Sequence, residues 1–189
     1  MGGDARLNLL LTHEESRPYL DQSQQPWYRT ISHMLAPLGV RTFEATSGAQ
    51  AVEFIERHPI HVAIVDSRLP AISGLNILQL VQKLCVQKLP PVAGQPESTG
   101  TLHLQMRVEQ RTDEGVTQRR IDVKVNARPA PPSTPTVILL TPPQHDDQLL
   151  HEALKFNAFS VLSEPVDVNL LLDLMARALR KFHQNQWPQ

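Results

Sequence analysis

Short apolar runs alternate with segments of helical spacing along this chain, and this alternation constrains its fold more than any other feature. The runs that read as buried strands are residues 7–12, 40–45, 61–66, 136–141 and 158–162. The segments with helical spacing are residues 26–38, a stretch capped by Ser47, and residues 74–88, 146–156 and 166–182. Regular alternation of strand and helix predicts a doubly wound α/β fold, with a parallel sheet and right-handed crossovers.

Residues 89–135 interrupt this rhythm. Proline-rich flanks, Pro90 to Pro96 and Pro129 to Pro135, enclose two stretches in which apolar and polar residues alternate. A four-residue turn at 112–115 would pair Leu102 with Val125, Leu104 with Val123 and Met106 with Ile121. We therefore expect a single domain over 1–189 that carries an insertion at 89–135, with a β-hairpin at 101–126. The apolar face of the hairpin either covers its own domain or contacts a partner.

Composition narrows the classes of partner. The chain has 189 residues, a formal net charge of −1 and one cysteine. This charge balance gives no reason to expect nucleic acid or an anionic membrane as a partner, and the single cysteine allows no internal disulfide. Residues 1–6 lack the apolar region of a signal peptide, and no run reaches transmembrane length. We expect a cytoplasmic protein.

Polar side chains follow the ends of four predicted strands. Asp66 closes the third strand, and Pro70 and Gly74 break the chain before the next helix. Acids also follow the first and fifth strands, and a hydroxyl ends the fourth: Glu14, Glu15, Glu164 and Thr141. Because the carboxyl ends of parallel strands lie at one edge of a sheet, these groups suit a hard cation such as Mg²⁺ and a phosphoryl group.

The pattern Asp66-x-x-Leu69-Pro70-x-x-x-Gly74 after a buried strand resembles the receiver domains of two-component response regulators. The resemblance covers residues 6–88 and 136–184, and includes the strand at 137–141 and the segment at 157–165. It implies the flavodoxin-like, five-stranded fold of the chemotaxis receiver CheY, and a signalling protein rather than an enzyme.

By this resemblance Asp66 would accept a phosphoryl group from a histidine kinase or a phosphotransfer protein. Glu14 and Glu15, together with Asp66 and the main-chain carbonyl of Arg68, would hold Mg²⁺. Thr141 would contact the phosphoryl oxygens. The output would pass through contacts with a downstream protein, and homodimer formation stays open.

Three positions depart from the family pattern. His13 stands where the first of two acids is usual, Glu164 replaces the near-invariant lysine, and Val161 replaces the usual switch aromatic. Two unit charges at 4 Å interact by about 4 kcal/mol at an effective dielectric near 20, so a pocket-facing Glu164 would oppose phosphorylation strongly. Glu164 reads equally as a pocket residue or an exposed turn residue. The Arg68 side chain could turn into the site, but its place in a loop after Ser67 favours a solvated surface charge.

Three functions follow. The first is a phosphorelay receiver without an output domain, and the second is a pseudo-receiver that docks partners without phosphorylation. The third, a small flavodoxin-like enzyme, is disfavoured because the chain has no glycine-rich phosphate loop, dinucleotide fingerprint or nucleophile elbow.

Overall fold

The structure is a computed structural model that describes residues 7–86, 101–112, 115–126, 135–144 and 147–182. Five parallel strands form its sheet: β1 (Asn8–Thr12), β2 (Arg41–Ala45), β3 (Val62–Asp66), β6 (Thr136–Thr141) and β7 (Ser160–Ser163). Their order is β2-β1-β3-β6-β7. The predicted doubly wound α/β fold is confirmed, and β3 lies at the centre of the sheet.

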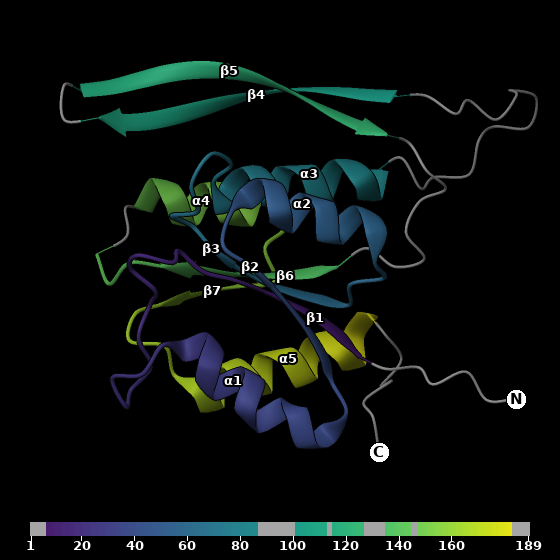
Figure 1. Ribbon diagram of the computed structural model, residues 1–189, viewed down its shortest axis with the longest axis vertical. Coiled ribbons are helices and arrows are strands. Elements are labelled where there is room, and N and C mark those ends of the chain that lie inside the picture. Colours follow the sequence, from purple (N-terminus) through teal and green to yellow (C-terminus); the bar gives the residue numbers. More distant parts are fainter. Residues whose placement is uncertain (1–6, 87–100, 113–114, 127–134, 145–146, 183–189) are drawn as a thin grey trace, which may run out of the picture.

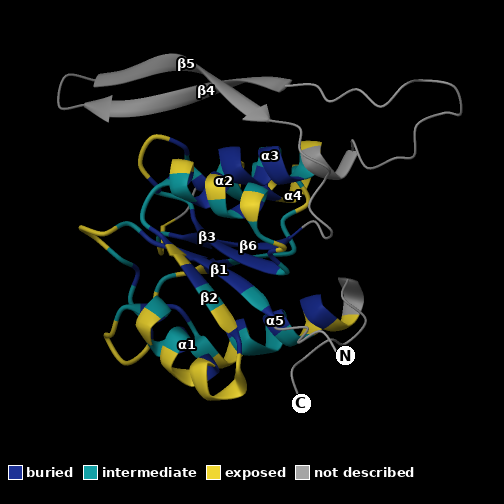
Figure 2. Ribbon diagram, turned by 45° about the vertical axis from the view of Figure 1, so that its right-hand side comes forward, coloured by how far each residue is buried: buried dark blue, intermediate teal, exposed yellow. Residues whose placement is uncertain are grey.

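Helices cover both faces of this sheet (Figure 1). One face carries α2 (Gly48–Arg57), α3 (Gly74–Val86) and α4 (Asp147–Lys155), and the other carries α1 (Trp27–Leu35) and α5 (Val168–Phe182). Each face has its own apolar cluster, and the three inner strands β1, β3 and β6 are almost entirely buried (Figure 2). Burial on both faces explains why β3 and β6 read as continuous apolar runs rather than as alternating ones.

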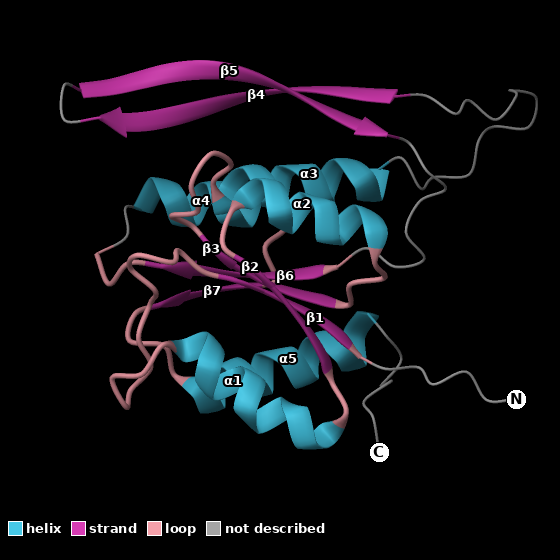
Figure 3. Ribbon diagram, in the orientation of Figure 1, coloured by secondary structure: helices cyan, strands magenta, loops and turns pink. Residues whose placement is uncertain are grey.

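Local chemistry explains most element boundaries (Figure 3). Ser47 caps α2, as predicted, by accepting a hydrogen bond from the Gln50 amide at 3.3 Å. The predicted helix 26–38 divides into α1 and the 3₁₀ turn η1 (Ala36–Leu38), which contains Pro37. Gly39 ends this turn with a φ of 70°, a conformation that glycine adopts at little cost.

Two further strands, β4 (Thr101–Thr112) and β5 (Gly115–Asn126), form an antiparallel pair apart from the main sheet. Leu102 pairs with Val125, Leu104 with Val123 and Met106 with Ile121, which is the predicted register. The side chains of the hairpin and most of its proline-rich flanks lie outside the described residues. The role of its apolar face therefore stays a prediction.

The link between β1 and α1 forms an ordered loop around Asp21, whose side chain is buried. Its carboxylate accepts hydrogen bonds from the Ser23 and Gln25 amides and from the Thr30 hydroxyl. Short bridges join Leu20 to Pro26 and Asp21 to Val166, so the loop is also held against the segment between β7 and α5. We call residues 17–26 the β1–α1 loop.

Candidate functional site

Asp66 ends the central strand, and its side chain is completely buried. Its main-chain N–H donates to the Thr12 hydroxyl at 2.8 Å, which joins the ends of β3 and β1. The next amide, of Ser67, donates to the Leu140 carbonyl of β6 at 2.9 Å. The acid is therefore fixed by both neighbouring strands at the carboxyl edge of the sheet, where open α/β folds place their ligands.

Both oxygens of the Asp66 carboxylate already have partners. Oδ1 accepts a hydrogen bond from the Arg68 amide at 2.7 Å, and Oδ2 accepts one from the Glu14 amide at 3.3 Å. Burial raises the pKa of Asp66 above its ordinary value, and the Arg68 hydrogen bond and charge lower it only in part. Asp66 is thus a desolvated carboxylate that two main-chain N–H groups hold in place.

The Arg68 side chain returns to this carboxylate. Its Nε lies 3.6 Å from Asp66 Oδ1 and 4.0 Å from Glu14 Oε2, so one guanidinium faces two acids. Its Nη2 also donates to the Arg17 carbonyl at 2.8 Å. Only 29% of the side chain is exposed, and the interpretation of Arg68 as a solvated charge is wrong. The guanidinium bends inward because two carboxylates and an aromatic ring offer it partners there.

That ring belongs to Tyr19 in the β1–α1 loop. The Arg68 guanidinium carbon lies 3.6 Å from the ring centre, and the Tyr19 hydroxyl hydrogen-bonds with Ser67 Oγ at 3.2 Å. Tyr19 is fully buried. Burial, together with the charge of Asp66, raises the pKa of its hydroxyl far above the ordinary value, so the phenol stays neutral. The sequence gives no signal that the ring of Tyr19 carries Arg68.

Glu164, at the position of the usual lysine, is half-buried and serves the β1–α1 loop. Its Oε1 accepts a hydrogen bond from the Leu20 amide at 3.0 Å, and the Leu20 carbonyl accepts one from Val166 N–H at 2.8 Å. Glu164 is therefore not a fully exposed turn residue, and its carboxylate anchors the β1–α1 loop through the Leu20 amide.

Thr141 and Val161 lie on the neighbouring strands. Thr141 ends β6 and is buried, and its hydroxyl donates to the Leu162 carbonyl of β7 at 3.3 Å. Val161 is half-buried and contacts the apolar cluster on the α2–α3–α4 face. The structure places Thr141 beside the strand that bears Asp66, with its hydroxyl bonded to main chain.

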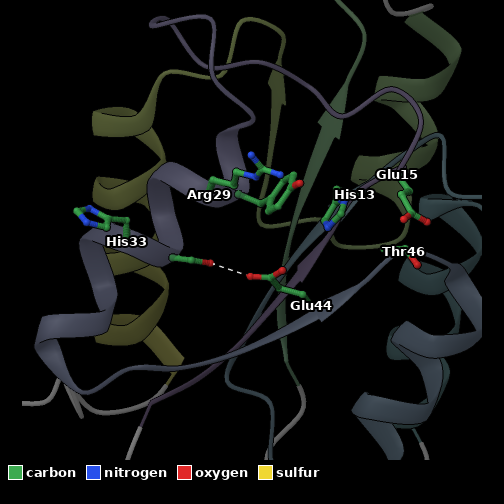
Figure 4. Close-up of a pocket in the computed structure, with 8 residues that line it drawn as sticks. His13, Glu15, Arg29, His33, Glu44 and Thr46 are labelled. Carbon is green, nitrogen blue, oxygen red and sulfur yellow. Dashed lines mark hydrogen bonds between the residues drawn. The ribbon is translucent and has the colours of Figure 1, made fainter.

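Glu15 and His13 line a separate surface pocket of about 720 Å³ beside α1 and β2 (Figure 4). The His13 ring stacks on Tyr28 with centroids 3.7 Å apart, so the residue at the position of the first acid packs against α1. Glu15 is exposed. The other residues that line this pocket are Tyr28, Arg29, Ser32, His33, Glu44 and Thr46.

Glu14 and Asp66, the two acids beside Arg68, can be tested as ligands of a magnesium ion. No group of three or more His, Cys, Asp or Glu side chains that could hold a metal occurs in the described part of the chain. Glu14 and Asp66 nevertheless share one cation, the Arg68 guanidinium, which stands in for an ion between them. Mg²⁺ commonly binds through one or two carboxylates and keeps several waters, so this donor set fits it.

Comparison with solved structures identifies the fold. The receiver domain protein (CheY-like) from Methanospirillum hungatei JF-1 has a TM-score of 0.60 and 13% identity, and the match covers 95% of this chain and 98% of that one. A receiver domain from Clostridium thermocellum has a TM-score of 0.56 and 19% identity, with 93% and 95% covered. The chemotaxis protein CheY4 of Vibrio cholerae has a TM-score of 0.54 and 15% identity, with 93% and 100% covered.

These matches confirm that the chain has the CheY-like fold of response-regulator receiver domains, as its sequence pattern predicted. No protein-family model matches the sequence, and no curated protein matches it either. Among the described residues, no helix is long and apolar enough to cross a membrane.

Proposed function

We propose that this chain is a receiver module of two-component signalling and that Asp66 is its phosphoacceptor. The observation that carries this proposal is the acid itself: a fully buried carboxylate at the carboxyl edge of the central strand, with a cation beside it. Glu164, the main objection from the sequence, is bonded to the Leu20 amide. Arg68 places a positive charge beside Asp66, with its Nε 3.6 Å from Oδ1, and this charge favours a dianionic phosphoryl group.

The reaction is a transfer of one phosphoryl group. Asp66 Oδ forms a bond to phosphorus while the bond from phosphorus to the donor atom breaks, and the donor leaves with that electron pair. The carboxylate must be ionised to act as the nucleophile, and the Arg68 amide and guanidinium favour its ionised form. A histidine kinase or a phosphotransfer protein would be the natural donor.

Mg²⁺, when bound, would neutralise part of the charge that gathers on the phosphoryl oxygens. Glu14, Asp66 and the Arg68 carbonyl are the groups that would hold it. Thr141 lies at the end of the adjacent strand, where its hydroxyl could exchange the Leu162 carbonyl for a phosphoryl oxygen. Glu15, which lines the pocket beside α1, is a weaker candidate ligand than Glu14.

The module would transmit its signal by direct contact with a downstream protein. The faces around β7 and α5 and the β4–β5 hairpin are the candidate surfaces. The hairpin prediction is tested by Leu104→Arg combined with Val123→Glu, which should abolish association with a partner or with a second copy.

The experiment for Asp66 uses a small phosphodonor. Incubating the protein with acetyl phosphate and Mg²⁺ should add one acid-labile phosphate of about 80 Da by intact mass, and Asp66→Ala should show none. Asp66→Asn is the matched control, because it keeps the side-chain volume and removes the charged nucleophile.

A second function is favoured by a specific observation. Both oxygens of Asp66 already accept main-chain hydrogen bonds, and Arg68 forms an ion pair with Oδ1. A carboxylate whose two oxygens are both satisfied by the chain itself suits a pseudo-receiver, which docks partners without phosphorylation. If wild-type protein gains no phosphate, this function replaces the first.

A further inference from the structure

One buried hydrogen-bond donor beside Glu14 and Asp66 lacks an acceptor. Among the described residues, the Nε of Arg68 is inaccessible to solvent and makes no hydrogen bond, although two carboxylates lie at ion-pair distance. A buried N–H without an acceptor is rare in proteins and costs free energy, so its presence needs an explanation. The group is positioned beside the acceptor carboxylate, where an incoming oxygen could pair with it.

We propose that Arg68 supplies the positive charge that lysine supplies in typical receivers, and that it competes with the divalent cation for the acid pair. In the free site its guanidinium lies between Glu14 and Asp66. When Asp66 carries a phosphoryl group, Nε–H donates to a phosphoryl oxygen. The second half of this inference rests on the proposed function, whereas the competition with metal does not.

Charge balance gives the sign of the competition. Glu14 and Asp66 contribute two negative charges when ionised, and Arg68 contributes one positive charge at the same place. Removing the guanidinium leaves both carboxylates without a cation, so a divalent ion is attracted more strongly. Arg68 is also bound through Nη2 to the Arg17 carbonyl, which keeps the guanidinium beside the two acids.

Tyr19 is the positioning residue for this cation. The guanidinium carbon lies 3.6 Å from the centre of its ring, within the range of cation–π attraction, and an arginine on an aromatic face keeps its N–H edge free for acceptors. The Leu20 amide, next in the chain, is bonded to Glu164. Glu164 therefore anchors the β1–α1 loop, and this loop positions the Tyr19 ring on which Arg68 lies.

The first test is a calorimetric titration of the unphosphorylated, full-length chain with MgCl₂. We expect Arg68→Ala and Arg68→Gln to bind Mg²⁺ about fivefold more tightly than wild type, the size expected for losing a partly exposed ion pair. Arg57→Ala removes the same charge from an exposed pair with Glu53 on α2, and should leave the affinity unchanged. Equal or weaker binding by both Arg68 variants would overturn the competition.

The second test measures the phosphorylated form. Arg68→Ala and Arg68→Gln should carry less adduct than wild type at the same donor concentration, and Arg68→Lys should retain part of it. One substitution thus raises metal affinity and lowers phosphoryl occupancy, which loss of folding would not do. Undiminished adduct in both variants would overturn the lysine-like role. Absence of adduct on wild type would instead overturn the proposed function, and leave the metal titration to decide the competition.

The positioning role has its own control. Tyr19→Phe keeps the ring and should keep the wild-type Mg²⁺ affinity, whereas Tyr19→Leu removes the ring and should shift the affinity toward that of Arg68→Ala. If Tyr19→Phe and Tyr19→Leu bind Mg²⁺ alike, the ring does not position Arg68.

Discussion

The guanidinium of Arg68 lies on the ring of Tyr19, with its central carbon 3.6 Å from the ring centre. This contact joins the loop after β3 to the loop after β1, and it places a cation against Asp66. It also accounts for the acid at the usual lysine position, because Glu164 bonds to the residue that follows Tyr19. Glu164, the β1–α1 loop and Arg68 thus form one connected arrangement that reaches Asp66.

Glu164 should matter for stability through its oxygen rather than through its charge. Glu164→Gln keeps an acceptor for the Leu20 amide and should be nearly neutral. Glu164→Ala and Glu164→Lys leave that amide without its partner, and should each lower the free energy of unfolding by about 1 kcal/mol. Urea denaturation of the three variants tests this, and a Glu164→Lys variant more stable than wild type would contradict the anchor role.

Because the pKa of Asp66 is raised, we expect the free energy of unfolding to depend on pH. The folded state binds a proton more readily than the unfolded chain, so this acid lowers stability as pH rises from its ordinary value through the raised one. Wild-type protein should therefore gain stability relative to Asp66→Asn when the pH falls from 7 toward 4. Paired urea denaturation curves at several pH values measure the difference, and a pH-independent difference would show that Asp66 titrates normally.

Asp21 predicts the opposite trend. Burial acts to raise the pKa of this acid, but hydrogen bonds from Thr30, Gln25 and Ser23 outweigh burial and hold the pKa below its ordinary value. Its contribution to stability is present above the ordinary carboxyl pKa and is lost as pH falls through the lowered one. The difference in stability between wild type and Asp21→Ala should shrink in acid.

At neutral pH, Asp21→Ala should lower the free energy of unfolding by about 1–3 kcal/mol, because three donors lose their acceptor. Asp21→Asn keeps one carbonyl oxygen for the two amides and should cost less. Equal losses in the two variants would show that the hydrogen bonds do not hold the β1–α1 loop.

Gly74 couples the start of α3 to the end of β3. A Cβ at this position would lie 2.6 Å from the Asp66 carbonyl oxygen and 2.9 Å from Ser67 Cα, both main-chain atoms that cannot rotate away. Gly74→Ala should therefore lower the free energy of unfolding by about 1–3 kcal/mol and shift the amide resonances of Asp66 and Ser67. Gln79→Ala, on the same helix, is the control and should stay within about 0.5 kcal/mol of wild type.

The sequence predicted the layers of the fold well because they depend on local patterns. The strand 136–141 is found with its predicted bounds, because a short run of β-branched residues and leucines is typical of a strand that is buried on both faces. The last helix begins at Val168 rather than at Val166, because the Asp167 carboxylate accepts from the Leu170 amide and caps it there.

The site was predictable only in part. The position of Asp66 follows from the strand that it ends, and the adjacency of Glu14 follows from the neighbouring strand. Tyr19, which carries the Arg68 guanidinium, and Leu20, which donates to Glu164, lie in the β1–α1 loop. The path of this loop depends on hydrogen bonds around Asp21 rather than on any periodic pattern. Side chains that meet across two such loops leave no local signal in the sequence, which is why Arg68 reads as a surface charge.

Chemical mapping of the phosphorylated residue tests directly whether Asp66 is the acceptor. After treatment with acetyl phosphate and Mg²⁺, sodium borohydride would reduce an aspartyl phosphate to homoserine, and tandem mass spectrometry of the peptides would locate it. We expect homoserine at position 66 in wild-type protein and in Arg57→Ala. Arg68→Ala should give a smaller yield, and Asp66→Asn should give none. Homoserine at another acid, or at none in wild-type protein, would contradict it.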